Sequence, residues 1–119
     1  MENKEGLIWY DGNLVDWKDA KLHVLTHGLH YASSVFEGER SYSGRIFKLH
    51  EHTERLLYSA SELDFEIPYS IDEIKQASYL TLEKNNLVDA YIRPIAWRGA
   101  ETVGAVSYTH LTLPTRNCG

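Results

Sequence analysis

The sequence predicts one α+β domain, with an antiparallel-rich sheet and two helices. Two hairpin signals precede residue 50, two helical patterns occupy residues 50–85, and one more strand pattern follows them. This order differs from the regular alternation of strands and helices that builds parallel sheets. With about 150 residues per domain as a guide, 119 residues correspond to one domain at most.

The first predicted element is a hairpin that turns at Asp11 and Gly12. Apolar and aromatic residues dominate the flanking runs, residues 7–10 and 13–17. Both turn positions must tolerate a positive φ, and an Asp-Gly pair does so at little cost. The two runs are therefore expected to pair as antiparallel strands.

Two further strand signals precede the first helix. Apolar and polar residues alternate at residues 21–25, which favours a short strand. A second hairpin is expected to turn on Ser43 and Gly44, with residues 45–49 as its return strand.

Two helices follow. Residues 50–64 carry apolar side chains at helical spacing, and the run before Pro68 ends this helix because a residue preceding proline resists the α conformation. The second helix begins at Ser70, which forms a capping box with Glu73. Residues 85–86 are both asparagine and are a plausible stop.

The last predicted strand covers residues 89–97, in which larger and smaller side chains alternate. Pro94 lacks a backbone N–H, so this strand is expected to lie at a sheet edge or to contain a bulge.

Composition and charge exclude several classes of function. The chain has 12 Lys+Arg and 17 Asp+Glu, a formal net charge of −5, which argues against nucleic acid as the main partner. No apolar run reaches the length of a membrane span, and the polar N-terminus is not a signal peptide. Cys118 is the single cysteine, so no disulfide framework is expected, which fits a cytoplasmic protein.

The histidines do not predict a metal site. His23, His27 and His30 would share a face only on a helix. The His-Glu-His run at residues 50–52 lacks the zincin spacing, and no cysteine pair supports either group. Surface or turn histidines are the simpler interpretation.

Arginines are the more informative residues. Arg40 and Arg93 lie on predicted strands among aromatic residues, where a guanidinium could bind a carboxylate or a phosphate. The pattern alone favours solvated charge or a pair with Asp or Glu. Five aromatic side chains could line a pocket or simply form core: Tyr31, Phe36, Tyr42, Tyr91 and Trp97. No activated nucleophile is identifiable, so pattern alone gives no activity.

Four segments go further than pattern. They are IWYDG at residues 8–12, HGLHYASSVFEGER at 27–40, HEHTERL at 50–56 and AYIRP at 90–94. Together they resemble the N-terminal small domain of branched-chain amino acid aminotransferases, enzymes of fold type IV. The resemblance covers residues 6–104.

The resemblance implies a transaminase that uses pyridoxal 5′-phosphate (PLP) in a ping-pong reaction. The amino group would move between branched-chain L-amino acids (Leu, Ile, Val) and 2-oxoglutarate, so amino acids and 2-oxo acids are the implied partners. The Schiff-base lysine of this family lies in a second domain, and neither Lys75 nor Lys84 matches it. The 119-residue chain is therefore expected to have no catalytic residue of its own and no transaminase activity.

The resemblance also implies roles for seven residues. Arg55 resembles the arginine that binds the PLP phosphate, whereas Tyr31 and Arg93 resemble the pair that recognises the substrate's side-chain or α-carboxylate. The remaining residues resemble those that line the pocket or cleft: Phe36, Gly38, Arg40 and Tyr91. In such enzymes the equivalent of Tyr31 tends to serve the neighbouring subunit, which implies a homodimer or a larger homo-oligomer.

The resemblance ends before the C-terminus. Residues 106–115 resemble the translation of a sequencing adapter, so residues 1–105 are expected to form the small domain and residues 106–119 a non-native tail. The alternative is a diverged native C-terminus, whose Thr-x-Thr alternation would allow a strand.

Two other functions remain open. A D-amino acid aminotransferase or aminodeoxychorismate lyase would share the fold, although residues 36–40 speak against it. Glu39 is unusual in that block, because it would put a charge beside the cleft. The third possibility is a non-catalytic ligand-binding or interaction module.

Overall fold

A computed structural model describes residues 5–31, 34–99 and 109–116, the last range as backbone alone. The expected boundary after residue 105 and Cys118 lie outside these residues. The strands are β1 (Leu7–Tyr10), β2 (Asn13–Asp16), β3 (Ser34–Phe36), β4 (Glu39–Tyr42), β5 (Arg45–Ile46), β6 (Ala90–Ile92), β7 (Ile95–Arg98) and β8 (Thr109–Arg116). The helices are α1 (His27–Tyr31), α2 (Leu49–Glu62) and α3 (Ile71–Lys84), and a 3₁₀ turn covers Trp17–Asp19.

The first hairpin is confirmed. β1 and β2 are antiparallel, with Tyr10 opposite Asn13 at the turn. Asp11 and Gly12 both have positive φ, 48° and 99°, as a two-residue turn between twisted strands requires.

The predicted strand at residues 21–25 is wrong, because this segment is a loop that ends in a turn. The Thr26 hydroxyl donates to the His23 carbonyl (2.6 Å), and the Leu25 N–H donates to His23 Nδ1 (3.1 Å). These local bonds satisfy groups that a ladder would otherwise use. The unexpected short helix α1 follows directly.

The second hairpin is confirmed with a shorter return strand. Ser43 and Gly44 have φ of 51° and 81°, and β5 contains only Arg45 and Ile46. Lys48 adopts a left-handed conformation (φ 57°) and turns the chain into α2. The expected strand could not reach residue 49, because α2 already begins there.

The two expected helices are confirmed, α2 with bounds shifted by one or two residues. At α3, the Glu73 N–H donates to Ser70 Oγ (3.1 Å) and the Ser70 N–H donates to Glu73 Oε1 (2.9 Å), which completes the capping box. Asn85 is the C-cap of α3. Its side chain also accepts from the Leu7 N–H (2.7 Å) and so ties α3 to β1.

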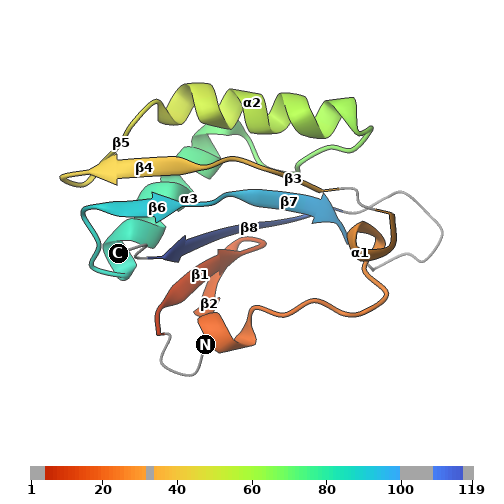
Figure 1. Cartoon of the computed structure of the whole chain (residues 1–119), viewed down its shortest axis with the longest axis horizontal. Coiled ribbons are helices and arrows are strands. Elements are labelled where there is room, and N and C mark those ends of the chain that lie inside the picture. The colour runs from red at the N-terminus through yellow and green to blue at the C-terminus, as the bar shows by residue number, and fades with distance from the viewer. Residues whose placement is uncertain (1–4, 32–33, 100–108, 117–119) are drawn as a thin grey trace.

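The strands form one sheet whose neighbouring strands run in the order β2-β1-β8-β6-β4-β5, while β7 pairs with β3 and β8. Every pairing described is antiparallel. Figure 1 shows β8 between β1 on one side and β6 and β7 on the other. The strand nearest the C-terminus is thus the centre of the sheet.

The predicted strand at residues 89–97 is interrupted at Arg93 and Pro94, between β6 and β7. Both halves have neighbours on two sides, so Pro94 lies at a break rather than at an edge. The Pro94 carbonyl accepts from the Glu37 N–H (3.0 Å), which holds the link between β3 and β4 against this break.

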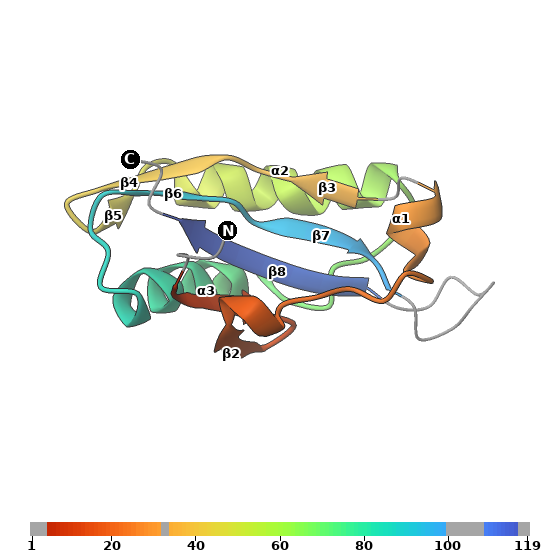
Figure 2. The same ribbon diagram turned by 60° about the horizontal axis from the view of Figure 1, so that its bottom comes forward.

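Figures 1 and 2 show α2 along β3 and β4, and α3 beside β8 and β1. The main core lies between these helices and the sheet. Leu56, Ile74 and Ala96 belong to it, and each is at most 1% exposed. β4 alternates, since Glu39 and Ser41 are buried while Arg40 and Tyr42 are exposed. None of the helices in the described residues is long and apolar enough to cross a membrane.

Candidate functional site

An arginine contacts two aromatic residues just after the end of β6. Arg93 Nε and Nη2 both donate to the Tyr91 hydroxyl, at 3.0 and 2.8 Å. The guanidinium carbon of Arg93 also lies 4.3 Å from the centroid of the Phe36 ring, a cation–π distance. We call Phe36, Tyr91 and Arg93 the aromatic–arginine cluster. The Tyr91 hydroxyl binds the Nε–Nη2 edge of the Arg93 guanidinium, whereas Nη1 has no hydrogen-bond partner among the described residues.

Gly38 and Arg40 adjoin this cluster. Arg40 lies directly opposite Tyr91 in the β4–β6 ladder, so the two side chains share a face of the sheet. A Cβ on Gly38 would lie only 2.8 Å from the Tyr91 hydroxyl. Glycine at this position therefore makes room for the Tyr91 phenol.

We expect Gly38→Ala to displace the Tyr91 hydroxyl, because the added methyl group would lie inside van der Waals contact. The shift would break both hydrogen bonds from Arg93, and overpacking of this kind costs about 1–3 kcal/mol. Chemical denaturation of the purified chain measures the loss.

Tyr91→Phe supplies the matched background, because it removes the oxygen that the methyl group would meet. The cost of Gly38→Ala should fall to less than about half in that background. An equal cost with and without the hydroxyl would contradict this account of Gly38.

A second group joins the β3–β4 link to α2. Arg55 Nε donates to Glu37 Oε2 (2.8 Å), and Arg55 Nη2 donates to Glu37 Oε1 (2.7 Å). His52 Nδ1 lies 2.7 Å from the same Oε1. We call Glu37, His52 and Arg55 the carboxylate–arginine cluster. For Arg55, the simpler alternative of pairing with an acidic residue is thus observed.

The charge state of Glu37 follows from its partners. Burial acts to raise the pKa of this carboxyl, but the hydrogen bonds and charges of Arg55 and His52 outweigh it, so the pKa lies below its ordinary value. The same carboxylate raises the pKa of Arg55. Glu37 is therefore ionised and can only accept, so His52 Nδ1 carries the shared proton.

Glu39, expected from the sequence to put a charge beside the cleft, lies on the opposite face of β4 from Arg40. Its side chain is on the buried side of β4 and is 2% exposed. Oε1 of Glu39 has no hydrogen-bond partner among the described residues. Burial, with a smaller contribution from the charge of Glu37, raises the pKa of Glu39 to about 8. The protonated acid is accordingly its main form at neutral pH.

The two clusters are adjacent in the chain, because Phe36 belongs to one and Glu37 to the other. The Glu37 N–H donates to the carbonyl of Pro94, the residue after Arg93. Each cluster holds a guanidinium by one edge, and Arg55 remains 65% exposed. Planar guanidinium edges bind carboxylates and phosphates in bidentate fashion, so the arrangement is suited to binding anions.

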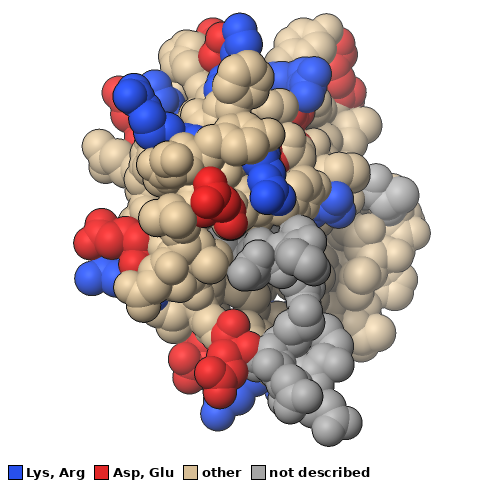
Figure 3. Space-filling view, turned by 60° about the vertical axis from the view of Figure 1, so that its left-hand side comes forward, with Lys and Arg blue, Asp and Glu red and all other residues tan. Residues whose placement is uncertain are grey.

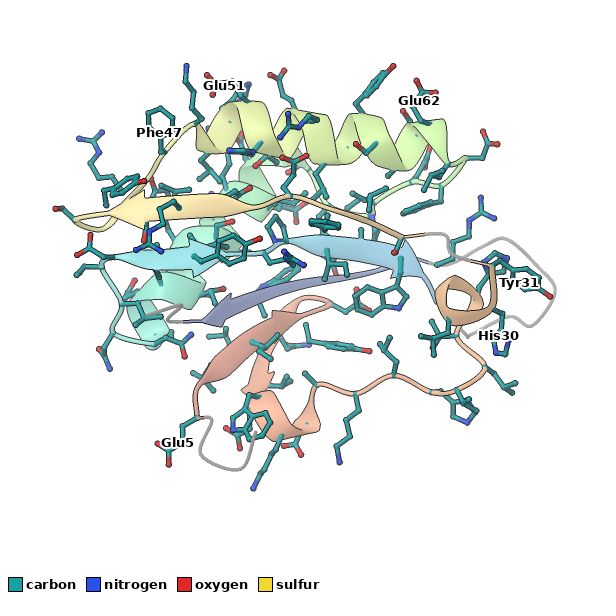
Figure 4. The ribbon with its side chains drawn as sticks, viewed as in Figure 1. Glu5, His30, Tyr31, Phe47, Glu51 and Glu62 are labelled. Atoms are coloured by element: carbon teal, nitrogen blue, oxygen red, sulfur yellow. The ribbon has the colours of Figure 1, made fainter. Side chains whose placement is uncertain are left out.

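Tyr31 is not brought to these clusters. It lies on α1, is 71% exposed and packs against the His27 ring, with 4.6 Å between the ring centroids and 38° between the ring planes. Figure 4 shows Tyr31 projecting at the end of the molecule opposite Phe47. Its expected partnership with Arg93 therefore receives no contact within this chain.

Sequence reasoning missed the roles of Glu37 and His52. Alternation of apolar and polar residues would have placed Phe36 inward and Glu37 outward, whereas the structure exposes Phe36 and buries Glu37. The histidine lies three residues before Arg55 on α2, a spacing that puts both on one helix face.

Other surface features carry less chemistry. Acidic and basic side chains are interspersed on the face shown in Figure 3. A mostly apolar pocket of about 320 Å³ has Tyr10, Leu22, Leu29 and Trp97 in its wall, and none of the seven predicted site residues. Within residues 5–31 and 34–99, no three metal-ligating side chains come together.

Comparison with known proteins gives concordant matches. The family model for amino-transferase class IV matches residues 34–116. A Rickettsia felis protein named "Probable branched-chain-amino-acid aminotransferase" is 55% identical over 96 residues, 81% of this chain and 33% of that protein. The branched-chain-amino-acid aminotransferase of Pseudomonas aeruginosa is 50% identical over 108 residues, 87% of this chain and 35% of that protein. The chain spans about a third of the length of these relatives.

Solved structures agree. The crystal structure of the Escherichia coli branched-chain amino acid aminotransferase superposes with a TM-score of 0.90 and 40% identity, over 98% of this chain and 41% of that chain. The T.th. branched-chain amino acid aminotransferase complexed with N-(5′-phosphopyridoxyl)-L-glutamate gives 0.89 and 38%, over 96% and 41%. These matches agree with the expected fold, the small N-terminal part of fold type IV aminotransferases.

Proposed function

The chain belongs to the class IV aminotransferases, and we propose that it is the N-terminal part of a PLP-dependent transaminase that acts on branched-chain L-amino acids and 2-oxoglutarate. The observation that carries this proposal is the position of both clusters within the region that is 50–55% identical to branched-chain enzymes. The two guanidiniums there would serve two different anions, one on the substrate and one on the cofactor.

Arg93 is proposed to bind a substrate carboxylate. Tyr91 and Phe36 hold its Nε–Nη2 edge and one face, which leaves Nη1 for the ligand. A guanidinium fixed in this way loses little conformational freedom on binding. Phe36 and Gly38 would form the pocket wall, with Arg40 and Tyr91 beside them.

Arg55 is proposed to bind the PLP phosphate. Its donor chemistry fits, because the exposed guanidinium keeps N–H groups available after Glu37 has taken the Nε–Nη2 edge. When bound, PLP supplies the electron sink that stabilises negative charge at the substrate's Cα. The lysine that moves the proton there is proposed to lie in a second domain, outside these 119 residues.

We also propose the domain division given by the sequence, with residues 1–105 as the small domain and residues 106–119 as a non-native tail. The resemblance of residues 106–115 to a translated adapter supports this division. Alternating threonines allow the backbone of β8 to pair within the sheet whatever its origin.

A homodimer or larger assembly in the cytoplasm completes the proposal. Leu29 and Tyr31 on α1 are 59% and 71% exposed, and Val24 and Leu25 just before them are exposed as well. Apolar side chains gathered on one short stretch of chain favour burial against another subunit. Tyr31 would then serve the neighbouring subunit's site.

The test begins with long, adapter-free reads of the source DNA across the codon for Ala105. We expect the frame to continue into a domain that carries a lysine, and we call its product the full-length enzyme. Purified full-length enzyme should transaminate leucine with 2-oxoglutarate, and the 119-residue chain should not.

Contrary results separate the alternatives. A frame that ends at Gly119, or turnover by the 119-residue chain, would overturn the proposal. Activity of the full-length enzyme on D-amino acids or aminodeoxychorismate alone would reassign its substrate. Ligand binding by a native short chain without turnover would favour the non-catalytic module.

A further inference from the structure

The contact between Glu37 and Arg55 differs from an ordinary surface ion pair. The Glu37 side chain is 5% exposed whereas that of Arg55 is 65% exposed, so the carboxylate is the buried partner. Both carboxylate oxygens are used, at 2.8 and 2.7 Å. A side-on, two-point contact of this kind fixes the plane of the guanidinium as well as its position.

Glu37 is in turn held from two directions. Its backbone N–H donates to the Pro94 carbonyl (3.0 Å), and its Oε1 accepts from His52 Nδ1 (2.7 Å). His52 and Arg55 lie on α2, while Glu37 and Pro94 belong to the interrupted strands. The carboxylate is therefore a fixed point where helix and sheet meet, and Arg55 is oriented from it.

The contact leaves a defined part of Arg55 available. Nε and one hydrogen of Nη2 are taken by Glu37, whereas Nη1 and the second hydrogen of Nη2 have no partner among the described residues. These remaining donors form the end-on edge of the guanidinium, which suits two oxygens of one anion.

We infer that Glu37 is a positioning residue, which anchors Arg55 so that its Nη1–Nη2 edge is presented to the phosphate of the cofactor. This inference rests on the proposed function, in which Arg55 binds that phosphate. His52 acts one step further back, by holding the carboxylate of Glu37.

The charge of Glu37 and its positioning of Arg55 predict opposite effects of neutralising Glu37 on phosphate binding, which makes the inference testable. If Glu37 acted only through its charge, its neutralisation would strengthen phosphate binding, because an anion near the site would be removed. If it acts by position, neutralisation weakens binding, because glutamine has one acceptor oxygen instead of two and the two-oxygen contact that fixes the Arg55 plane is lost.

The experiment measures the PLP dissociation constant of the full-length enzyme, by absorbance of the bound cofactor, and the phosphorus NMR shift of its phosphate. Glu37→Gln should raise the dissociation constant roughly tenfold, since the rotamer freedom of Arg55 is no longer lost in advance. At saturating PLP, kcat should stay within about twofold. If Glu37→Gln does not fold, His52→Gln replaces it, with an expected rise of about threefold.

Glu51→Gln is the matched control. Glu51 lies on the same helix, pairs only loosely with Lys48 (3.7 Å), and is labelled on the outer side of α2 in Figure 4. It should leave the dissociation constant unchanged. Unchanged or tighter PLP binding in both Glu37→Gln and His52→Gln would overturn the inference.

Arg55→Ala separates the two levels of the proposal. It should weaken PLP binding by more than about 100-fold, and Glu37→Gln should add little in that background. If Arg55→Ala has no effect, the cofactor role of Arg55 is wrong. If Arg55→Ala weakens binding and Glu37→Gln does not, only the positioning role is wrong.

A readout on the 119-residue chain needs no cofactor. In the nitrogen-15 spectrum, the Arg55 Nε–H signal should be displaced from that of the exposed Arg45, and Glu37→Gln should remove the displacement. Identical Nε–H signals for Arg55 and Arg45 would contradict the anchoring.

Discussion

Replacing Glu39 with glutamine is expected to abolish a loss of stability that the chain otherwise suffers between about pH 4.5 and pH 8. Burial raises the pKa of this carboxyl to about 8 in the folded chain, against an ordinary value of 4.5. Between these values the folded state keeps a proton that the unfolded state has released. The contribution of Glu39 to stability therefore falls as the pH rises through this window and is constant outside it.

The size of the effect follows from the same two values. Their difference, 8 − 4.5 = 3.5, corresponds to roughly 3–5 kcal/mol in the free energy of unfolding. Glu39→Gln stays neutral at every pH, so the variant should match the parent near pH 5 and be more stable by several kcal/mol above pH 8.

Denaturant midpoints at pH 5, 6.5 and 8.5 test this, with the buried Trp9 and Trp97 as fluorescent reporters. Glu66→Gln is the matched control, because Glu66 is exposed and should leave the pH dependence of the parent intact. A parent and a Glu39→Gln variant with parallel pH profiles would show that the Glu39 carboxyl titrates normally.

Replacing Arg93 with leucine should lower kcat/KM of the full-length enzyme for glutamate about 100-fold, mainly through KM. The physical reason is the loss of charge-assisted hydrogen bonds to a substrate carboxylate, each worth about 1.5–3 kcal/mol. Arg93→Lys should recover only part of the loss, because an ammonium cannot keep the two-point contact with the Tyr91 hydroxyl and bind a carboxylate as a fork.

Leucine as a second substrate identifies the carboxylate. If Arg93 recognises the side-chain carboxylate, the fall in kcat/KM is confined to glutamate and 2-oxoglutarate. If it recognises the α-carboxylate, kcat/KM for leucine falls by a similar factor. Arg45→Leu, at the exposed tip of the second hairpin, is the control. A change in kcat/KM below threefold for both substrates would show that Arg93 does not bind a substrate carboxylate.

Local chemistry made much of the fold predictable. Asp11-Gly12 and Ser43-Gly44 each specify a turn by their tolerance of positive φ, and both turns are present. Ser70 and Glu73 specify the start of α3 through mutual hydrogen bonds. In each case the residues that carry the signal also form the contacts that stabilise the element.

Features that depend on distant partners were not predictable. Residues 21–25 alternate like a strand, but no strand among the described residues pairs with them, and they form a loop. The Pro94 break is central rather than peripheral, because β3, β4 and β8 come from other parts of the chain.

For the candidate site, the resemblance named Phe36, Tyr91 and Arg93, and the structure brings these three together. The different charge states of Glu37 and Glu39 could not be predicted from the sequence. Both are buried, two residues apart, yet only Glu37 contacts an arginine and a histidine of α2. The partners of Glu37 lie on α2, so they depend on how this helix packs against the sheet, which local sequence does not show.

The central position of β8 has a consequence for synthesis. Ile8 pairs with Pro114, so two neighbours in the sheet are separated by nearly the whole chain. During translation, β1, β6 and β7 emerge with edges that pair with residues 109–116 in this chain. Helices α2 and α3 are local and can form early, whereas pairings between distant segments form slowly. A strand at the β8 position, whatever its origin, therefore has to leave the ribosome before this sheet can close, and the edges of β1, β6 and β7 are open to association with other chains until then.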